Sequence, residues 1–546
     1  MLLLLLGLIF FPSTGRDDSL ILYWPAHTLV HSGQFLNNMF LQQVSSLSFP
    51  VLVAVFHFSL PIDLLYVGWG LSVVLGLLTV YLAAAYAQEL GFSNSHFIGF
   101  LLATAIPMAY WTFSGMETTL YAFSLLLFVV VIAKFLQSER SVPGILTLLV
   151  TANLLLVRTE APVILLFFFV AYPICLAVPD WLNLSWLSFR RPTRFSRKRR
   201  NLIVTFSLLF SLKLGFQKYY FDSIFPQPTI AKVLSGGSLK LVDGVTYVFQ
   251  LRQSLAMTLL VMLLFAVLGL SVWNILEEHR DGEVPVSVSV LFVMLLAYLS
   301  FVVGSGGDWM EGGRFLAPGL SLIYLMIAAG FKNYSHEGFK RTVFAGLLIA
   351  QVVLLGGFIF HNSTSLPLFK AWSIAERRDL KDYTVVEIAN KTTLKDIYVL
   401  EKLKLLGADL LQKQQRFSLI SGQGGLIPYH LAREFFPNFI FVDRRGLVSS
   451  HFTDCQHIVD FGANQLGLIF PEVIYHKNRE VVNQECLGFA PDLFHGSLKE
   501  SQVSRELYQT LGLKLIYRNT LDLKQLSPHW LPGYSPVTTN VLLVEE

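Results

Sequence analysis

Eight charged residues stand out because they lie in the polar connections between long apolar stretches. A charge at mid-bilayer costs about 2.5–3.5 kcal/mol on insertion scales. Acids beside cations could do chemistry on a lipid-linked phosphate. A carboxylate would take the proton of an incoming hydroxyl, and cations would stabilise a phosphate leaving group. The residues are Asp17, Asp18, Glu117, Arg158, Glu160, Lys232, Asp308 and Arg314.

Taken one at a time, these residues have plain structural explanations. The acidic pair at 17–18 fits a solvated loop, and Glu117, at the start of an apolar run, favours the positive end of a helix dipole. Arg158 and Glu160 could pair with each other in a tight turn. Lys232 fits a loop that follows two prolines, and Asp308 and Arg314 fit an ion pair at a helix end.

The composition indicates a membrane protein. Of 546 residues, 53% are hydrophobic and 14% are charged, against about 25% charged in soluble domains. We predict a transmembrane domain over 1–361 and a soluble domain over 362–546. The expected fold is a polytopic α-helical bundle of about eleven spans. Beyond the first run, the predicted spans are 62–88, 95–111, 117–137, 143–157, 159–177, 201–217, 254–276, 285–304, 315–331 and 341–361.

The basic segment "FRRPTRFSRKRR" at 189–200 sets the orientation, because lysine and arginine gather in cytoplasmic loops. It also suits contact with anionic lipid headgroups. Counting spans from it, with 45–58 as a re-entrant or surface-lying segment, places all the candidate residues and everything after 361 on the outer face. A single polar cavity that opens outward would give this pattern.

The first apolar run covers about 16 Å, against about 30 Å of hydrocarbon, so we expect a first span whose beginning is missing.

Cys175 lies in an apolar run, where an inert role is expected. Cys455 and Cys486 could pair if the tail lies in an oxidising compartment. No Cys/His spacing suggests structural zinc.

The polar tail alternates strand-like and helix-like stretches. The stretch at 394–414 has helical spacing, and 417–430 reads as a strand, a glycine turn and a helix start. Further strands are predicted at 439–447, 468–477 and 513–519. The pattern predicts a small α/β domain, which would guide an acceptor.

Five short motifs, in order, resemble those of the GT-C glycosyltransferases, polytopic enzymes that use polyprenyl-phosphate sugars. The nearest subgroup is the cell-wall arabinofuranosyltransferases; aminoarabinose and protein O-mannosyl transferases are looser matches. Three departures stand at Thr159, at Trp24-Pro25 and at 311–313, where the family has a proline, a more helical Arg-Tyr and a more basic run. The motifs are "DDSLILYWPAHTLVHSGQF", "SGMETTLYA", "VRTEAP", "FPQPTIAK" and "GGDWMEGGRFLAP".

The resemblance implies an inverting transfer. Asp17 or Asp18 would deprotonate the acceptor hydroxyl, which attacks the anomeric carbon while polyprenyl phosphate leaves. Some relatives use a divalent metal, Mg²⁺ or Mn²⁺, and others use none, so both stay open. The cations that would bind the phosphate are Arg158, Lys232 and Arg314. The acids that would orient these cations or sugar hydroxyls are Glu117, Glu160 and Asp308.

The expected partners are a polyprenyl-phosphate sugar donor, the lipid bilayer, and a glycan, lipid or protein acceptor at the outer face of a bacterial cytoplasmic membrane. No nucleic-acid partner is expected. The main alternative is a lipid-linked sugar flippase, which would show ionisable residues at mid-span and inverted repeats. A phosphoethanolamine transferase would need a metal cluster in the tail, whose histidines are scattered. A non-catalytic protein that binds lipid-linked sugars is a further alternative.

Overall fold

The computed structural model divides the chain into two compact units. The first unit consists of Met1–Phe11, Trp69–Phe216 and Leu239–Ser363, and the second of Pro12–Gly68, Gln217–Ser238 and Thr364–Glu546. The structure describes residues 2–10, 12–13, 18–34, 45–140, 142–181, 188–189, 195–221, 223–226, 241–249, 255–278, 283–307, 310, 312–332, 337–361, 366–376, 383–389, 391–421, 425–435, 437–443, 492–498, 513–522 and 537–545.

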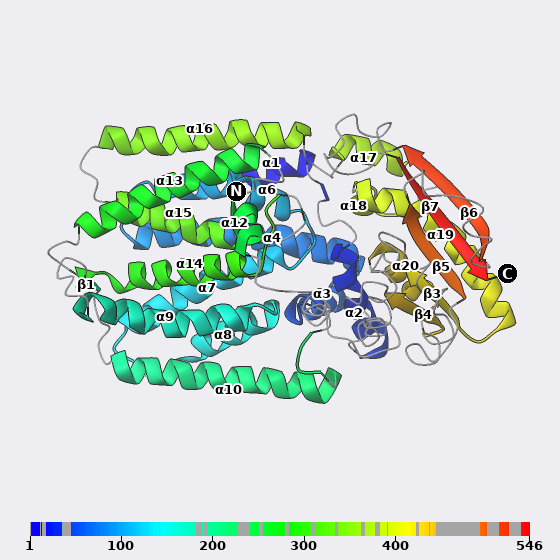
Figure 1. Ribbon diagram of the computed structural model, residues 1–546, viewed down its shortest axis with the longest axis horizontal. Coiled ribbons are helices and arrows are strands. Elements are labelled where there is room, and N and C mark those ends of the chain that lie inside the picture. The colour runs from blue at the N-terminus through cyan, green and yellow to red at the C-terminus, as the bar shows by residue number, and fades with distance from the viewer. Residues whose placement is uncertain are drawn as a thin grey trace. The chain divides into compact units, whose positions relative to one another are not determined.

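The first unit is helical (Figure 1). Two of its helices run across the division into the second unit, α4 at its start and α10 at its end. Two-residue strands β1 (Ser188–Phe189) and β2 (Glu283–Val284) pair in parallel. The helices are α1 (Leu2–Phe10), α4 (Leu64–Glu89), α5 (Ser95–Thr104), α6 (Ile106–Trp111), α7 (Thr118–Gln137), α8 (Ile145–Val157), α9 (Ala161–Trp181), α10 (Phe195–Phe221), α12 (Leu241–Val248), α13 (Leu255–Glu278), α14 (Val286–Gly304), α15 (Ala317–Phe331) and α16 (Glu337–His361).

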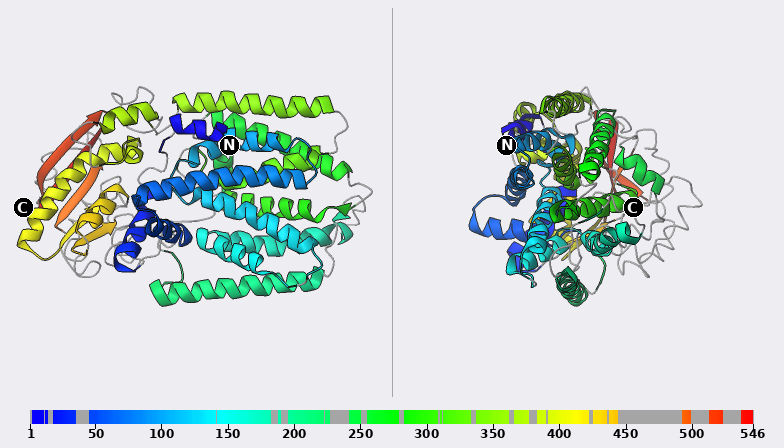
Figure 2. Two further views of the ribbon diagram at one scale, coloured as in Figure 1. Left: turned by 180° about the vertical axis from the view of Figure 1, so that it is seen from behind. Right: turned by 90° about the vertical axis from the view of Figure 1, so that its left-hand side faces the viewer.

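Helices α7 and α15 form the core of the first unit. Every residue of α15 is buried, and the most apolar stretch of α7 is 83% buried, against 22% in α16. Figures 1 and 2 show α10 and α16 along opposite edges of the bundle, with α7, α14 and α15 between them. Helices that are apolar on all sides are expected to be buried, so α7 and α15 form the centre around which the other helices of the bundle pack.

Five described helices are long and apolar enough to cross a membrane, namely those at Leu64–Glu89, Thr118–Gln137, Thr258–Glu278, Val286–Gly304 and Gly338–Ile359. By length and composition, the chain is therefore a multi-pass membrane protein. Five further apolar helices are shorter, with 10–17 residues. The ends of the five long helices lie within about four residues of the ends of predicted spans.

The predicted span at 95–111 forms two helices, α5 and α6, and not one. Ala105, between them, has an extended backbone with ψ of 127°. Pro107 lies in the first turn of α6, where its missing amide hydrogen costs nothing. A proline inside a continuous helix would leave the carbonyl one turn earlier without its backbone hydrogen-bond donor. The chain therefore ends one helix and begins another.

The second unit combines a sheet with helices. The sheet has five strands in the order β4-β3-β5-β7-β6. β3 lies parallel to β4 and β5, whereas β7 lies antiparallel to β5 and β6. The strands are β3 (Phe417–Ser421), β4 (Phe439–Asp443), β5 (Leu493–Leu498), β6 (Leu513–Asp522) and β7 (Val537–Glu545). The helices are α2 (Asp18–Ser32), α3 (Ser48–Ser59), α17 (Leu368–Ala375), α18 (Val385–Ile388), α19 (Lys391–Lys413) and α20 (Leu426–Phe435).

Helix α19 packs along the sheet against β3, β6 and β7 (Figure 2). Its buried side chains Ile397, Leu400 and Leu403 recur every three residues and so share one face. Elements α19, β3, β4, α20 and β6 lie in the stretches where the sequence predicts them. The strand predicted at 468–477 and both tail cysteines lie outside the described residues.

One close helix contact in the first unit allows a direct test of packing. A Cβ atom added to Gly330 of α15 would lie 2.4 Å from the carbonyl oxygen of Ser271 in α13, whereas a Cβ at Gly346 of α16 would meet nothing within 4 Å. We expect Gly330→Ala to destabilise the protein by about 1–3 kcal/mol through overpacking. Gly346→Ala should be neutral or slightly stabilising. Apparent melting temperatures in detergent distinguish these results, and an unchanged value for Gly330→Ala would contradict the close contact.

Candidate functional site

Three of the predicted site residues form a buried ion cluster in the first unit. The Arg158 Nη1 atom donates to Glu117 Oε1, and Arg158 Nε donates to Glu160 Oε1 at 2.7 Å. The side chains of Arg158 and Glu160 are 8% exposed, and that of Glu117 is 1% exposed. The two carboxylates therefore hold one guanidinium group away from solvent.

The short turn between α8 and α9 sets this geometry. α8 ends at Val157 and α9 begins at Ala161, so Arg158 and Glu160 occupy a three-residue connection. Arg158 has an extended backbone, with φ of −145° and ψ of 148°. The amide of Ile164 donates to the carbonyl of Glu160, which fixes the start of α9. Glu117 reaches the cluster from the start of α7.

Electrostatics keep Arg158 charged despite its burial. Burial lowers the pKa of Arg158, but the Glu160 and Glu117 carboxylates raise it further, so the pKa lies above its usual range. Removing a charge of this kind from water costs several kcal/mol, which only well-placed counter-charges offset. The cluster is therefore a fixed positive group held between two acids.

Polar atoms of α7 beside the cluster have no hydrogen-bond partner in the described part of the chain. They are Glu117 Oε2, the Thr118 hydroxyl and the Tyr121 hydroxyl, all buried. Glu117 and Tyr121 are four residues apart and therefore share one helix face. Because buried polar atoms in native proteins are almost always hydrogen-bonded, this face suits the hydroxyl groups of a ligand.

A second buried cation lies near the first. Arg314 is 8% exposed, and its Cζ atom lies 5.4 Å from the centroid of the Phe315 ring. The Cζ atom of Arg158 lies 5.6 Å from the same centroid. Both distances allow attraction between a guanidinium group and an aromatic ring. One phenyl ring therefore contacts two guanidinium groups, which together suit a phosphate because each presents a planar fork of donors.

Aromatic side chains from three helices hold the backbone around Arg314. The Trp111 Nε1 atom donates to the carbonyl of Gly312 at 3.0 Å. The amide of Phe315 donates to the Tyr247 hydroxyl at 2.9 Å, and the Tyr298 hydroxyl donates to the Phe315 carbonyl at 2.8 Å. Trp111 and Tyr298 lie within predicted spans, where the sequence indicates core packing, and Tyr247 lies in the connection between two predicted spans, so sequence reasoning missed all three.

Glycine is required at two places in this loop. Gly312 has φ of +72°, and a Cβ atom there would lie 2.6 Å from the ring of Tyr110. Gly307 has φ of +80°, and its Cβ atom would lie 2.1 Å from Tyr247. Both need the left-handed conformation that glycine adopts without steric cost. The glycine-rich sequence is thus explained by the close approach of aromatic rings to the loop backbone.

A buried lysine near the cluster was also missed. The Lys213 Nζ atom of α10 donates to the carbonyl of Leu155 at 2.8 Å, in the last turn of α8. The sequence placed Lys213 inside the predicted span at 201–217. A lysine within an apolar run is a signal of function or of a specific partner, and this one could have been singled out.

Asp18 is the first residue of α2, in the second unit. The ring of Trp24 stacks on Phe439 with centroids 6.5 Å apart and contacts Phe441 at 6.0 Å. Tyr23 lies 6.4 Å from Tyr429 of α20. The helix that begins at the predicted base is therefore docked on α20 and β4. Asp17, Lys232 and Asp308 lie outside the described residues.

Helix α2 also carries a buried histidine. His27 is 8% exposed, and its ring lies 4.0 Å from that of His31 and 6.4 Å from that of Tyr429. Burial, followed by the nearby His31 and Arg433, lowers the pKa of His27 to about 3. The imidazole is therefore neutral at physiological pH and packs as an aromatic group.

No described group of three or more His, Cys, Asp or Glu side chains could hold a metal ion. The donors of the buried cluster are already committed to Arg158 through Glu117 Oε1 and Glu160 Oε1.

Replacing Arg158 tests whether the cluster is held together by charge. Arg158→Met leaves two buried carboxylates without their counter-charge, which should destabilise the protein by about 3–5 kcal/mol. The control is Lys134→Met, which removes the exposed Lys134–Glu89 pair and should cost about 1 kcal/mol or less. Thermal unfolding in detergent measures both variants. Equal small losses would show that Arg158 is not held by the carboxylates.

The second unit contains another buried pair, with a pH dependence of its own. His430 Nε2 lies 2.5 Å from Glu387 Oε1, and the other Glu387 oxygen accepts from the amide and hydroxyl of Thr384. Burial alone would raise the pKa of Glu387, but His430 and Thr384 lower it below its usual value. A lowered carboxylate pKa stabilises the fold above the unfolded-state pKa, and this stabilisation is lost as pH falls through the folded-state pKa.

We therefore expect Glu387→Gln to be less stable than the wild type at pH 7, with a difference that shrinks as pH falls below about 4. Melting temperatures measured between pH 7 and pH 3.5 would show the convergence. The control is Glu434→Gln, because Glu434 is half-exposed and its replacement should leave the pH profile unchanged. Parallel profiles for the wild type and Glu387→Gln would exclude a role for this pair.

Several solved structures show a distant likeness to this chain over 90% or more of its length. The neighbours include ArnT from Cupriavidus metallidurans bound to undecaprenyl phosphate, with 10% identity, a TM-score of 0.48, and coverage of 99% of this chain and 96% of that chain. The same protein in the apo state gives 11% identity, a TM-score of 0.49 and the same coverage.

An oligosaccharyltransferase from Archaeoglobus fulgidus, in complex with Zn and sulfate, gives 11% identity and a TM-score of 0.46, covering 90% of this chain and 67% of that chain. No protein-family model and no curated protein matches the sequence.

Proposed function

We propose that the protein is an integral-membrane glycosyltransferase that moves a sugar from a polyprenyl-phosphate donor to an acceptor in the cell envelope. The observation that carries the proposal is the pair of buried guanidinium groups, Arg158 and Arg314, on the ring of Phe315. Two fixed cations at the ends of apolar helices suit an anion that is attached to a hydrocarbon chain. A lipid phosphate has this chemistry.

In the proposed reaction, Arg158 and Arg314 bind the donor phosphate and stabilise it as it leaves. Glu160 holds Arg158 in place through its 2.7 Å hydrogen bond. Glu117 shares this task and presents its second oxygen, with Tyr121, to hydroxyl groups of the sugar. The carboxylates keep the site from becoming so positive that it would hold the phosphate product too tightly.

The sequence motifs supply the remaining roles. Asp17 or Asp18 takes the proton of the acceptor hydroxyl, and that oxygen attacks the anomeric carbon from the face opposite to the leaving phosphate, with inversion. Lys232 adds a third phosphate contact and Asp308 orients a cation or a sugar hydroxyl. These roles rest on the resemblance of the motifs at 17–35, 225–232 and 306–318.

The proposed setting is a bacterial cytoplasmic membrane, with the site open to the outer face. The predicted division assigns 1–361 to catalysis in the membrane and 362–546 to an extracytoplasmic domain that guides a glycan, lipid or protein acceptor. The docking of α2 on α20 and β4 supports a direct part for the C-terminal residues in holding the loop that begins with the two aspartates.

A transfer assay in proteoliposomes tests the function. Radiolabelled polyprenyl-phosphate sugars would be offered with an envelope extract as acceptor, and Asp17→Asn and Asp18→Asn compared with the wild type. Loss of the general base should reduce transfer by about 10²–10⁴-fold in one of the two variants. The matched control is Asp409→Asn, because Asp409 is an exposed acid of α19 paired with Lys413, and its replacement should leave transfer unchanged.

One result would overturn the proposed function, and another would overturn only the assignment of the general base. If no donor in the panel is consumed but labelled lipid crosses the bilayer, the protein is a flippase. If both aspartate variants transfer sugar at the wild-type rate, neither carboxylate is the base, although the transferase assignment would stand.

A further inference from the structure

Helix α10 carries two buried lysines, and each binds the end of another helix. α10 lies at an edge of the bundle (Figures 1 and 2), and Lys198 and Lys213 are 0% and 8% exposed. The Lys213 Nζ atom donates to the carbonyl of Leu155 in the last turn of α8. The Lys198 Nζ atom donates to the carbonyl of Leu136 at 2.8 Å, in the last turn of α7, and to that of Ser138. Each ammonium group therefore binds carbonyl groups at a helix C-terminus.

The contact of Lys213 compensates for the end of α8. The last carbonyls of a helix have no amide partner within that helix. In a continuing helix, the carbonyl of Leu155 would accept from the amide of Thr159. α8 instead ends at Val157, and the backbone of Arg158 is extended. Lys213 therefore supplies the missing donor, and its charge also suits the negative pole of the helix dipole.

The helix end that Lys213 binds leads directly into the buried ion cluster. Arg158 and Glu160 follow it in the short connection between α8 and α9. The charge of Lys213 is attracted to that of Glu160, although the described part of the chain gives Lys213 no direct ion pair. Glu160 in turn holds Arg158 through the 2.7 Å hydrogen bond to Nε. The ammonium group therefore acts on the guanidinium group through the backbone of the turn and through Glu160.

The charge of Lys213 matters because the ion cluster is otherwise negative. Glu117 and Glu160 contribute two carboxylates against the one guanidinium group of Arg158, and an excess negative charge opposes the approach of an anion. A charge inside an apolar helix is costly, and a neutral hydrogen-bond donor would satisfy the carbonyl of Leu155 equally well. The need for a positive charge near Glu160 therefore explains why the residue is a lysine.

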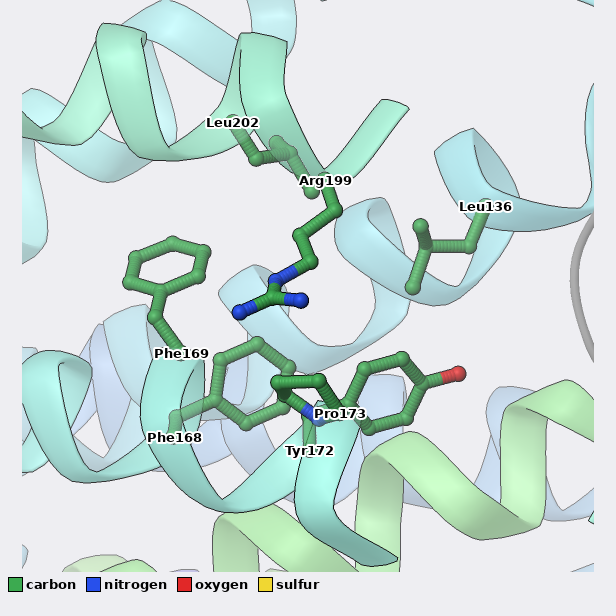
Figure 3. A pocket seen from close by; sticks show the side chains of 7 residues that line it. All are labelled: Leu136, Phe168, Phe169, Tyr172, Pro173, Arg199 and Leu202. Atoms are coloured by element: carbon green, nitrogen blue, oxygen red, sulfur yellow. The ribbon is translucent and has the colours of Figure 1, made fainter. Parts of the chain in front are cut away.

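Lys198 makes the same kind of contact far from the cluster. Its acceptor Leu136 lies 19 residues after Glu117 in the sequence, which corresponds to about 28 Å along a helix. Figure 3 shows this end of α10, where Arg199 and Leu202 lie with Leu136 of α7 and with aromatic side chains of α9 around a small pocket. Lys198 is therefore a matched reference, with the same helix, residue type and class of acceptor but no part in the ion cluster.

We propose that Lys213 is a positioning residue for the donor phosphate, an inference that rests on the proposed function. It holds the end of α8, and with it Arg158, in the geometry that binds the phosphate, and its charge balances the acids of the cluster. In this role Lys213 does not contact the donor, because it acts through Arg158 and Glu160. Loss of Lys213 therefore weakens phosphate binding more than loss of an equally buried lysine elsewhere on α10.

Binding of undecaprenyl phosphate to the full-length protein tests the inference without requiring transfer. Detergent-purified protein would be titrated with this lipid, the bound lipid counted by native mass spectrometry, and melting temperatures recorded in parallel. We expect Lys213→Met to bind about tenfold more weakly than the wild type, because small displacements of a positioned group have effects of this size or larger. Lys198→Met should lose a comparable amount of thermal stability and bind as the wild type does.

Two further measurements separate positioning from a purely structural role. Lys213→Arg keeps the charge and can donate to the same carbonyl, so it should restore most of the binding. Lys213→Gln keeps a donor without the charge, and it should bind more weakly than Lys213→Arg even if Lys213→Met does not fold. In the transfer assay, Lys213→Gln should raise the KM for the donor and leave the KM for the acceptor unchanged, a split that loss of folded protein does not produce.

The outcomes distinguish this inference from the proposed function. If the wild type binds undecaprenyl phosphate and the Lys213 variants bind it equally well, the inference is wrong and the proposed function stands. Equal weakening in Lys198→Met would show that binding follows the stability of the bundle, which would also overturn the inference. If the wild type itself does not bind undecaprenyl phosphate, the proposed function fails at its donor, and the inference fails with it.

Discussion

The burial of one positive charge governs the arrangement of the first unit. Arg158 lies almost out of contact with water, and such a charge is tolerated only where counter-charges approach it closely. Glu160 comes from the same short turn, but Glu117 lies 41 residues earlier in the chain, directly before α7. The ends of α7, α8 and α9 are therefore fixed to one another by a single guanidinium group. The ring of Phe315 adds the start of α15 to the same place.

Around this centre, backbone positions are set mainly by aromatic side chains. Trp111, Tyr247 and Tyr298 each form one hydrogen bond to the backbone between Gly312 and Phe315. In an apolar bundle, an indole or phenol group can lie among hydrocarbon side chains and still offer one directed hydrogen bond. The backbone at Gly312 and Phe315 is thus held by rigid groups on three helices.

Much of the helical order of the first unit could be predicted from sequence, because long apolar runs bounded by charges specify helices directly. The sequence predicts that Glu117, Arg158 and Glu160 lie close together only because their loops are expected on the same face of the membrane and because they belong to the resembling motifs. Other features leave no local pattern. The break at Ala105 depends on a single proline, and the tyrosines that hold the loop look like ordinary core residues. Lys213 could have been singled out from the sequence, because it is a charged residue within an apolar run.

The association of α2 with the C-terminal residues could not be predicted either, because it depends on contacts across the length of the chain. Trp24 and its partners Phe439 and Phe441 are separated by more than 400 residues. Hydrophobic patterning along one segment indicates which face is apolar, but it does not identify what covers that face. This is also why the predicted division at 361 and the two compact units of the structure group residues 12–68 differently.

That long-range contact has a consequence for the order in which the protein matures. Proteins are synthesised from the N-terminus, and segments fold as their partners emerge. Helix α2 is made early, yet the rings of β4 that cover Trp24 are made only after every helix of the first unit. Helix α2, which begins at Asp18, therefore gains its final support only after β4 has been made and folded. A nascent chain that lacks β4 would already contain the helices of the first unit, while α2 lacked the rings that cover Trp24.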